Sequence, residues 1–278
     1  MNPRDHRLFR EYPLLGSATT STGTAPTPYH IYNGYGAFIG GTADLGPIQQ
    51  LLRKESVTPM QTTGARAFMG IWVCNFTDAS LGPHHELQFS FFVSGRRDER
   101  IVARPLSLLT LLATRPDVQM LCHGLWNNTA RVVAYNRELL SLNACVTLSQ
   151  IDHAEGAFQF DFKDGASGRA IIAGRLPNPE RASLRANWEM MSNIGFRRIW
   201  TLYQQPWMGL RILNPTGIGL NRNGVAETFT KNQTIAVRYF CNKTDTLEFG
   251  EATYGCVNFK PEFVQYMTGF KFVYLMPK

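Results

Sequence analysis

The sequence has little of what most often identifies a function at once. Its 278 residues include only five cysteines, an odd number with no Cys-x-x-Cys pair, which argues against a disulfide framework and against a zinc site. It has no Gly-x-Ser-x-Gly elbow, no GxxxxGK phosphate loop and no GxGxxG dinucleotide fingerprint. We therefore expect neither a metal nor a cofactor.

Charge and long apolar runs are also scarce. Charged residues make up 18% of the chain, no apolar run approaches the roughly 20 residues that span a bilayer, and the first residues are charged. We expect a cytoplasmic protein with no membrane partner. The net charge of +7 favours anionic partners. Because the basic residues are scattered, we expect a small molecule and no nucleic acid.

Alternating and glycine-rich segments predict a mostly β domain with helices. Strands are expected in the segments 29–43, 65–73, 86–93, 144–148, 157–162 and 170–173, and through most of 196–275. Helices are expected in the segments 105–113, 128–140 and 182–191, and a short one after Asp44, which is expected to cap it. Residues 1–28, rich in Ser, Thr, Gly and Pro from Gly16 onward, predict a flexible N-terminal arm. Residues 29–278 predict a single domain.

The densest group of titratable residues is His84-His85-Glu86, which opens an alternating strand. On an extended chain His84 and Glu86 share one face and His85 lies on the other. A carboxylate beside an imidazole suits a general acid or base, since either pKa can be moved towards neutrality. A solvated turn is the plainer interpretation of the same residues.

Three segments, in order, resemble the acetoacetate decarboxylase-like superfamily. The first is Pro28-Tyr-His-Ile-Tyr-Asn33 with the short helix after it. The second is Gly70 to Glu86, which is similar to the family's glycine-rich loop and glutamate-bearing strand. The third is Asn136-Arg-Glu-Leu-Leu-Ser-Leu-Asn-Ala-Cys145, which keeps the Arg-Glu-Leu of the family's motif. The resemblance implies an α+β fold: a cone-shaped β-barrel with a strongly curved antiparallel sheet, a few short helices, and a homo-oligomer (a dimer or larger).

The departures from the family pattern bear on the chemistry. The family decarboxylates β-keto acids through a lysine Schiff base, and the two lysines of its motif fall at Ala144 and Cys145. The family's substrate-binding arginine falls at Gly34 and a second active-site glutamate at Ile71, so Glu86 alone is retained. The resemblance therefore implies a similar cavity without imine chemistry, unless Lys54, Lys163, Lys231 or Lys260 supplies the amine.

We expect an enzyme that acts as a cyclase, isomerase or lyase on an apolar, carbonyl-containing secondary metabolite. Glu86 is the expected proton-transfer residue, with His84 or His85 tuning it. The matched segments suggest five substrate-binding residues: Tyr29, Tyr35, Asn75, Asn143 and Cys145. A non-catalytic binding protein and a decarboxylase with a displaced lysine are the alternatives. For Cys145 we expect a buried inert thiol, with a nucleophile as the alternative, because no base is visible beside it.

Overall fold

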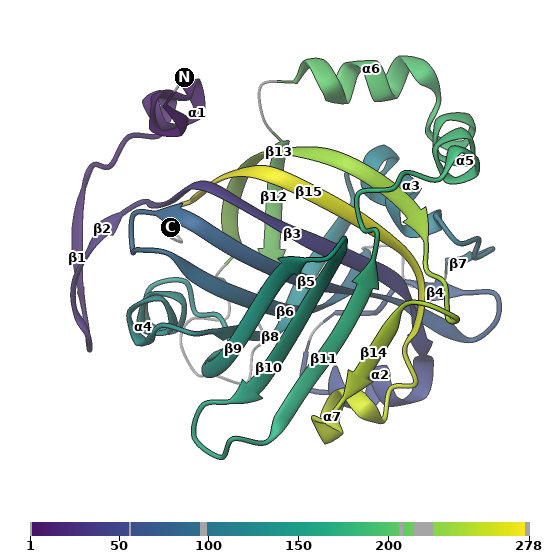
Figure 1. Ribbon diagram of the computed structural model, residues 1–278, viewed down its shortest axis with the longest axis horizontal. Helices are drawn as coiled ribbons and strands as arrows, with labels where there is room; N and C mark the ends of the chain where they lie inside the picture. The colour runs from purple at the N-terminus through teal and green to yellow at the C-terminus, as the bar shows by residue number, and fades with distance from the viewer. Residues whose placement is uncertain (1, 56, 95–98, 206–207, 214–224, 276–278) are drawn as a thin grey trace.

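The computed structural model describes residues 2–55, 57–94, 99–205, 208–213 and 225–275, with the backbone only for 208–213 and 225–229. The described strands form one 13-stranded sheet and a separate two-stranded hairpin, and short helices lie around them (Figure 1). This arrangement confirms the predicted α+β architecture with a large sheet.

The strands vary from two residues to sixteen. They are β1 Gly16–Thr20, β2 Gly23–Thr27, β3 Tyr29–Asp44, β4 Gln61–Thr62, β5 Arg66–Ala79, β6 His84–Ser94, β7 Arg100–Ile101, β8 Val118–Asn127, β9 Ala144–Ala154, β10 Ala157–Asp164, β11 Ala170–Pro177, β12 Met208–Leu213, β13 Val225–Tyr239, β14 Thr246–Phe249 and β15 Lys260–Tyr274.

The helices of the described chain are all short. They are the 3-10 turn Pro3–Asp5, α1 Arg7–Glu11, α2 Leu45–Leu51, α3 Ser107–Thr114, α4 Ala130–Glu138, α5 Leu184–Ile194, α6 Phe196–Gln204 and α7 Ala252–Gly255. None of them, within the residues described, has the length and apolar character needed to cross a membrane.

Strand β6 lies between β5 and β8, with antiparallel pairing on both sides. Beyond β5 the antiparallel order continues through β3, β15 and β13 to β12. Figure 1 shows β3, β5, β6 and β15 running across the molecule, while β9, β10, β11 and β14 cross them as a second layer. Strand β6 is therefore an interior strand with neighbours on both edges.

The sheet is mixed, so the expectation of an antiparallel sheet is wrong in part. Strands β8 and β9 pair in parallel, as do β8 with β12 and β4 with β7. The reason is visible in the connection: α4 lies between β8 and β9, and a crossover of this kind returns the chain in its original direction. The cone-shaped barrel stays a prediction.

Two hydrophobic cores lie on opposite faces of β5 and β6. The strand-side core joins residues of odd number on these strands, among them Ile71, Val73 and Leu87, to the layer of β9–β11. Strand β10 contributes the alternating Phe158, Phe160 and Phe162, which are all buried. Each such side chain gives about 2 kcal/mol of favourable burial, which holds the two layers together.

The helix-side core joins residues of even number on the same strands, including Cys74 and Phe92, to helices α3, α4 and α5. Helix α4 contributes Val132, Val133 and Tyr135, which follow the helical spacing of one apolar face. Both faces of β6 are therefore covered, and the polar side chains of Glu86, Gln88 and Ser90 are removed from water.

The segment from Phe196 begins with a helix, so the expectation of strands there is wrong for residues 196–204. Phe196, Trp200 and Tyr203 recur at helical spacing, a signal that outweighs the β preference of aromatic residues. The neighbouring helix α5 overlaps the helix predicted for residues 182–191 and continues to Ile194. It is capped by Ser183, whose Oγ accepts from the Ala186 amide at 3.2 Å.

The expectation that the Asp44 side chain caps α2 is also wrong. Asp44 occupies the position before α2, but its carboxylate caps no helix amide. Instead it accepts hydrogen bonds from the Arg66 guanidinium and from Asn258 Nδ2, the latter at 3.0 Å. The charge of Arg66 is a stronger partner for a carboxylate than a backbone amide is.

The predicted N-terminal arm contains α1 and the β1–β2 hairpin, which Figure 1 shows along one edge of the molecule. The hairpin is held to α4 at two points: Arg131 Nη2 donates to the Thr24 carbonyl oxygen at 3.0 Å, and Ser21 bonds Glu138. Glu138 accepts a hydrogen bond from the Ser21 amide at 2.9 Å and a second from the Ser21 hydroxyl. The retained Arg-Glu-Leu segment thus has a structural role here. The division of the chain at residue 28 stays a prediction.

Candidate functional site

A row of polar side chains runs along the helix-side face of β6. His84, Glu86, Gln88 and Ser90 alternate with His85, Leu87 and Phe89, and the four are all buried. Gln88 Nε2 donates to Ser90 Oγ at 2.6 Å. In a strand covered on both faces, such groups cost free energy unless they are paired, so a row of four indicates a site and not an ordinary core.

Glu86 is the charged member of this row and is only 6% exposed. Asn127 Nδ2 donates to Glu86 Oε2 at 3.2 Å, and Asn136 Nδ2 in turn donates to Asn127 Oδ1 at 2.9 Å. Burial raises the pKa of Glu86 from 4.5 to about 7, and the hydrogen bond from Asn127 opposes that rise. The carboxyl group therefore exchanges its proton near neutral pH.

His84 lies beside Glu86 on the same face but bonds elsewhere. Its Nδ1 is 3.0 Å from the carbonyl oxygen of Gly82, and its Nε2 is 2.9 Å from the hydroxyl of Tyr29. A carbonyl oxygen only accepts, so Nδ1 carries the hydrogen. Burial lowers the pKa of His84 to about 4, which keeps the ring neutral and makes Nε2 an acceptor for the Tyr29 hydroxyl.

Aromatic rings and thiols surround the carboxyl group. Tyr29 stacks on Tyr274, with 5.4 Å between ring centroids. Cys74 lies directly opposite Glu86 across the β5–β6 pair, and Cys122 lies in β8 opposite Ser90 of the same polar row. Burial, followed by the charge of Glu86, raises the pKa values of all four groups far above their usual range. At neutral pH they are uncharged, and Glu86 is the titrating group among them.

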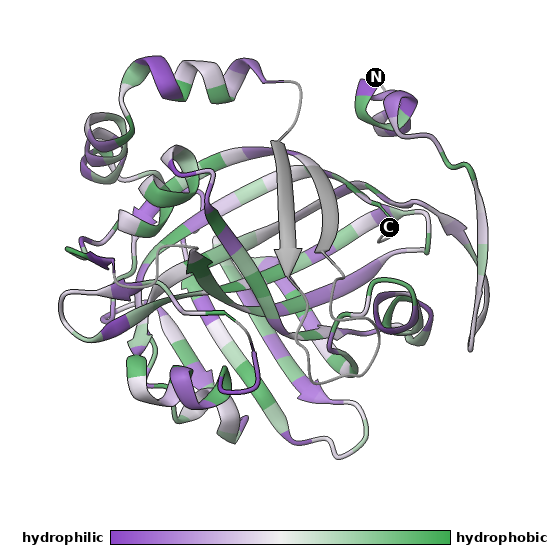
Figure 2. Ribbon diagram, turned by 180° about the vertical axis from the view of Figure 1, so that it is seen from behind, coloured by the Kyte–Doolittle hydropathy of each residue, from purple (hydrophilic) through white to green (hydrophobic). Residues whose placement is uncertain are grey.

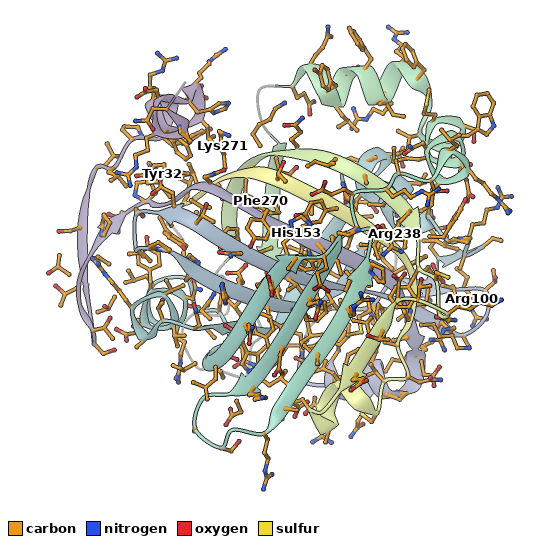
Figure 3. All side chains as sticks on the ribbon, in the orientation of Figure 1. Tyr32, Arg100, His153, Arg238, Phe270 and Lys271 are labelled. Carbon is orange, nitrogen blue, oxygen red and sulfur yellow. The ribbon has the colours of Figure 1, made fainter. Side chains whose placement is uncertain are left out.

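Three of the predicted residues lie on the opposite face of the sheet. His85 points away from Glu86: its Nδ1 is 3.0 Å from Ser149 Oγ, and its pKa is lowered mainly by burial. Asn75 Nδ2 donates to Tyr35 Oη at 3.0 Å, and the Tyr35 ring centroid lies 6.2 Å from that of His153. Figure 3 labels His153 on the ribbon. Alternation along β3, β5 and β6 therefore divides the predicted residues between two faces.

The last two predicted residues lie near the start of β9. Asn143 Nδ2 donates to the His123 carbonyl oxygen at 3.1 Å, which fixes the chain just before the strand. Cys145 is exposed, so the expectation of a buried thiol is wrong. Its neighbour Ala144 is buried in the helix-side core. The side chain on the inner face at this motif is therefore a methyl group.

The structure also tests two positions that departed from the family pattern. At Gly34 an added Cβ would lie 2.6 Å from the Asn75 carbonyl oxygen, so this bulged position has no space for an arginine. Ile71 is buried in the strand-side core, on the opposite face from Glu86. The side chain at this matched position therefore faces away from Glu86, because Ile71 pairs with Phe89 across β5 and β6 and shares its face.

Asn127, Asn136, Gln88 and Ser90 belong to the site and were not predicted. Asn127 begins a glycosylation-type triplet and Asn136 opens the third family segment, but neither pattern indicates a buried amide. The alternation of β6 did show Gln88 and Ser90 on the face of Glu86. The pattern alone does not show that this face is buried, because the burial comes from helices that are distant in sequence.

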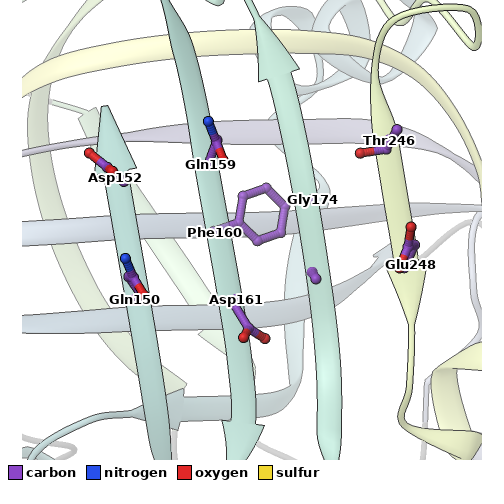
Figure 4. A pocket seen from close by; sticks show the side chains of 9 residues that line it. Gln150, Asp152, Gln159, Phe160, Asp161, Gly174, Thr246 and Glu248 are labelled. Atoms are coloured by element: carbon purple, nitrogen blue, oxygen red, sulfur yellow. The ribbon is translucent and has the colours of Figure 1, made fainter. Parts of the chain in front are cut away.

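Two surface pockets lie away from Glu86. One, of about 310 Å³, is open on the outer face of β9–β11 and β14, where Asp152, Asp161 and Glu248 line it (Figure 4). There Lys163 pairs with Asp161 at 2.9 Å. The other, of about 500 Å³, lies between the β1–β2 hairpin and α4. We place the candidate site at Glu86, because a buried carboxyl with a shifted pKa is the stronger chemical signal.

Comparison with known proteins supports the fold through structure alone. No family model and no curated protein matches the sequence. Acetoacetate decarboxylase from Legionella pneumophila subsp. pneumophila str. Philadelphia 1 superposes with a TM-score of 0.56 at 12% identity, covering 99% of this chain and 95% of that one. A second acetoacetate decarboxylase structure gives 0.54 at 10% identity, covering 90% and 87%.

A third structure is that of the enduracididine biosynthesis enzyme MppR with HEPES buffer bound. It gives a TM-score of 0.50 at 9% identity, covering 91% of this chain and 88% of that one. The three sequence segments that suggested this likeness lie in β3, β5–β6 and α4–β9, and through Tyr29, Glu86 and Asn136 they meet around one carboxyl group. The chain has the acetoacetate decarboxylase-like fold.

Proposed function

We propose that this protein is a small-molecule enzyme in which Glu86 moves a proton within a buried site, without a Schiff base. One observation carries the proposal: a carboxyl group that is 6% exposed has a pKa of about 7 and a hydrogen bond from Asn127. A group that is half ionised at neutral pH is suited to act as a base in one step and an acid in the next.

The proposed step begins at a carbon next to a carbonyl group. Ionised Glu86 takes the proton from that carbon, and the electron pair of the C–H bond forms an enolate. Returning the proton to another carbon completes an isomerisation. Attack of the enolate carbon on a second carbonyl group closes a ring, and the new alkoxide takes the proton from Glu86. Each route returns Glu86 to its ionised form.

The positions of the four candidate lysines support chemistry without an imine. Ala144 presents a methyl group where the family's motif has lysine, and the exposed thiol of Cys145 forms no imine. Lys54, Lys163 and Lys260 are exposed. Lys231 Nζ donates to the Tyr203 and Gln205 carbonyl oxygens. A displaced-lysine decarboxylase therefore has no support from the positions of these four residues.

The surroundings of Glu86 favour a largely apolar substrate with a carbonyl group. The rings of Tyr29 and Tyr274 supply flat apolar walls. Among the residues that the structure describes, two buried donors on the helix-side face find no hydrogen-bond partner: Trp72 Nε1, opposite Gln88, and Thr230 Oγ1, opposite Phe272. An unpaired buried donor is costly, so a carbonyl oxygen is the kind of group they would bind.

We also propose that the sheet forms a cone-shaped barrel around this site. It is supported by the pairing of β6 with both β5 and β8 and by the short parallel pairing of β12 with β8. These pairings would place Glu86, Gln88 and Ser90 on an inner wall. Secondary metabolism as the source of the substrate rests on the apolar surroundings of Glu86. A homo-oligomer is proposed from the family resemblance alone.

The test measures proton transfer directly, so it does not require the natural substrate. The protein is incubated in D2O with 4-phenyl-2-butanone, and loss of the signal of hydrogens next to the carbonyl is followed by NMR. We expect catalysed exchange by the wild type and a loss of roughly 100-fold or more in Glu86→Gln. Equal exchange by both proteins would overturn the assignment of Glu86.

Glu262→Gln is a matched control. Burial also raises the pKa of Glu262 to about 7, but this residue lies in β15 beside Thr42 and Arg66, so its variant should retain exchange. Borohydride treatment with acetoacetate should leave the protein mass unchanged, whereas a trapped adduct would support the displaced-lysine alternative. If wild type and variant bind the ketone equally and neither exchanges it, the chain is a binding protein.

A further inference from the structure

Helix α6 exposes a continuous row of aromatic rings. Phe196, Trp200 and Tyr203 are 66%, 51% and 75% exposed. Their rings stack in sequence, with centroids 6.4 Å apart for the first pair and 5.9 Å for the second. Three large rings on one stripe of a nine-residue helix form an apolar surface that water solvates poorly, which marks an interaction surface.

Helix α5, which packs beside α6, shows the same pattern. Leu184, Trp188 and Met191 recur at helical spacing and all are exposed. In Figure 1 both helices lie at the periphery, with α6 above the strands. In Figure 2 hydrophobic and hydrophilic bands alternate along α6. We call the six residues of these two rows the α5–α6 apolar surface.

The charge around this surface is strongly positive. Residues 181–205 contain four arginines, namely Arg181, Arg185, Arg197 and Arg198, and all are exposed. The same segment has one acidic residue, Glu189, whose carboxylate accepts a hydrogen bond from the Tyr239 hydroxyl at 2.5 Å. Four positive charges less one negative charge leave a local net charge of +3.

This charge decides between the possible partners. A second copy would bring the same positive charge onto the surface, on a chain that carries +7 overall, and like charges oppose such an association. An anionic lipid surface can bind both the exposed apolar side chains and the arginines around them. Trp, Tyr and Phe rings insert at the level of the headgroups, and arginines bind the phosphates around them.

We propose that the α5–α6 apolar surface docks this protein onto anionic membranes. From the sequence we expected no membrane partner, because the chain has no apolar run long enough to span a bilayer. A helix that lies in the plane of the interface needs no such length. The proposed docking is independent of the chemistry at Glu86, although an apolar substrate would itself concentrate in the membrane.

The test is co-sedimentation of the full chain with vesicles. One set contains phosphatidylcholine alone, and the other contains phosphatidylcholine with about one third phosphatidylglycerol. We expect binding to the anionic set and roughly thirtyfold weaker partitioning after Arg197→Gln with Arg198→Gln, the effect of losing two charges near a charged surface. The double variant Phe196→Ser with Trp200→Ser should reduce binding to the level seen with phosphatidylcholine alone.

Matched controls come from the distant strand layer. Arg169→Gln with Arg175→Gln removes two exposed charges, and Leu148→Ser removes an exposed apolar side chain in β9; both should bind as the wild type does. Circular dichroism verifies folding of each variant. Equal sedimentation of the wild type with both vesicle sets would overturn the proposal. A dimer that Phe196→Ser with Trp200→Ser dissociates, without vesicle binding, would do the same.

Discussion

At the scale of single residues, the main finding is a carboxyl group whose surroundings favour neither protonation state strongly at neutral pH. Burial favours neutral Glu86, while the amide of Asn127 favours the ionised form. His84 contributes no charge, because its ring is neutral and bonded to Tyr29 and Gly82. Any pH dependence of proton transfer near neutrality should therefore follow Glu86.

The rate of ketone exchange should rise with pH through about 7 and then level off. Glu86 must be ionised to take a proton from carbon, and its pKa sets the midpoint of that rise. Measuring the exchange rate from pH 5 to pH 9 by NMR checks this. A midpoint near 4.5, the usual value for glutamate, would mean that another group is the base or that Glu86 is solvated during the reaction.

The variant Asn127→Leu should move that midpoint upward. It removes the donor that stabilises the carboxylate, so ionisation becomes harder and the exchange rate at pH 7 falls severalfold while the rate at high pH recovers. A merely structural role would lower the rate equally at every pH. Asn75→Leu serves as the control, since Asn75 lies on the other face and bonds Tyr35.

At the scale of elements, prediction succeeded where local pattern is enough and failed where distant contacts decide. The spacing of apolar residues was enough to predict strands β6 and β10 and helices α3 and α4. It was not enough for the parallel pairing of β9 with β8, the helix α6 and the face of Ile71, because they depend on register and on neighbours. Glu86 was predictable as a candidate, whereas its amide partners were not.

Close packing between strands gives a prediction at this scale. An added Cβ at Gly70 in β5 would lie 2.4 Å from the Phe38 ring of the neighbouring strand, so Gly70→Ala must displace a buried ring. We expect a loss of about 1–3 kcal/mol in the free energy of unfolding, measured by urea denaturation. Gly46→Ala in α2, where the added Cβ meets nothing within 4 Å, should be neutral or stabilising. Equal effects would refute the packing argument.

At the scale of the whole molecule, the cost of burying Glu86 should appear as a pH dependence of stability. Its pKa is raised in the folded state, so the folded protein binds the proton more tightly than the unfolded chain. The contribution of Glu86 to the free energy of unfolding is therefore highest below pH 4.5. It falls as the pH rises through about 7. The shift from 4.5 to about 7 corresponds to about 3 kcal/mol.

Comparison of the wild type with Glu86→Gln isolates this effect. The variant cannot ionise, so its stability relative to the wild type should increase by about 3 kcal/mol between pH 4 and pH 8. His84 and His30, with pKa values lowered by burial to about 4, favour stability at higher pH in both proteins, and their contributions cancel in the difference. Urea denaturation at several pH values measures it, and parallel curves would show that Glu86 is not buried.

The loop between β5 and β6 links the surface of the molecule to this interior. Gly82 adopts a φ of +93°, which side-chain-bearing residues rarely adopt, and its carbonyl oxygen holds the hydrogen of His84 Nδ1. From there the donors all point the same way, outward from Tyr29 towards the loop. The hydrogen of the Tyr29 hydroxyl is therefore committed to His84, and towards any further group this hydroxyl can only accept. The geometry of one turn at the surface thus fixes the direction of two buried hydrogen bonds, from Tyr29 to His84 and from His84 to Gly82.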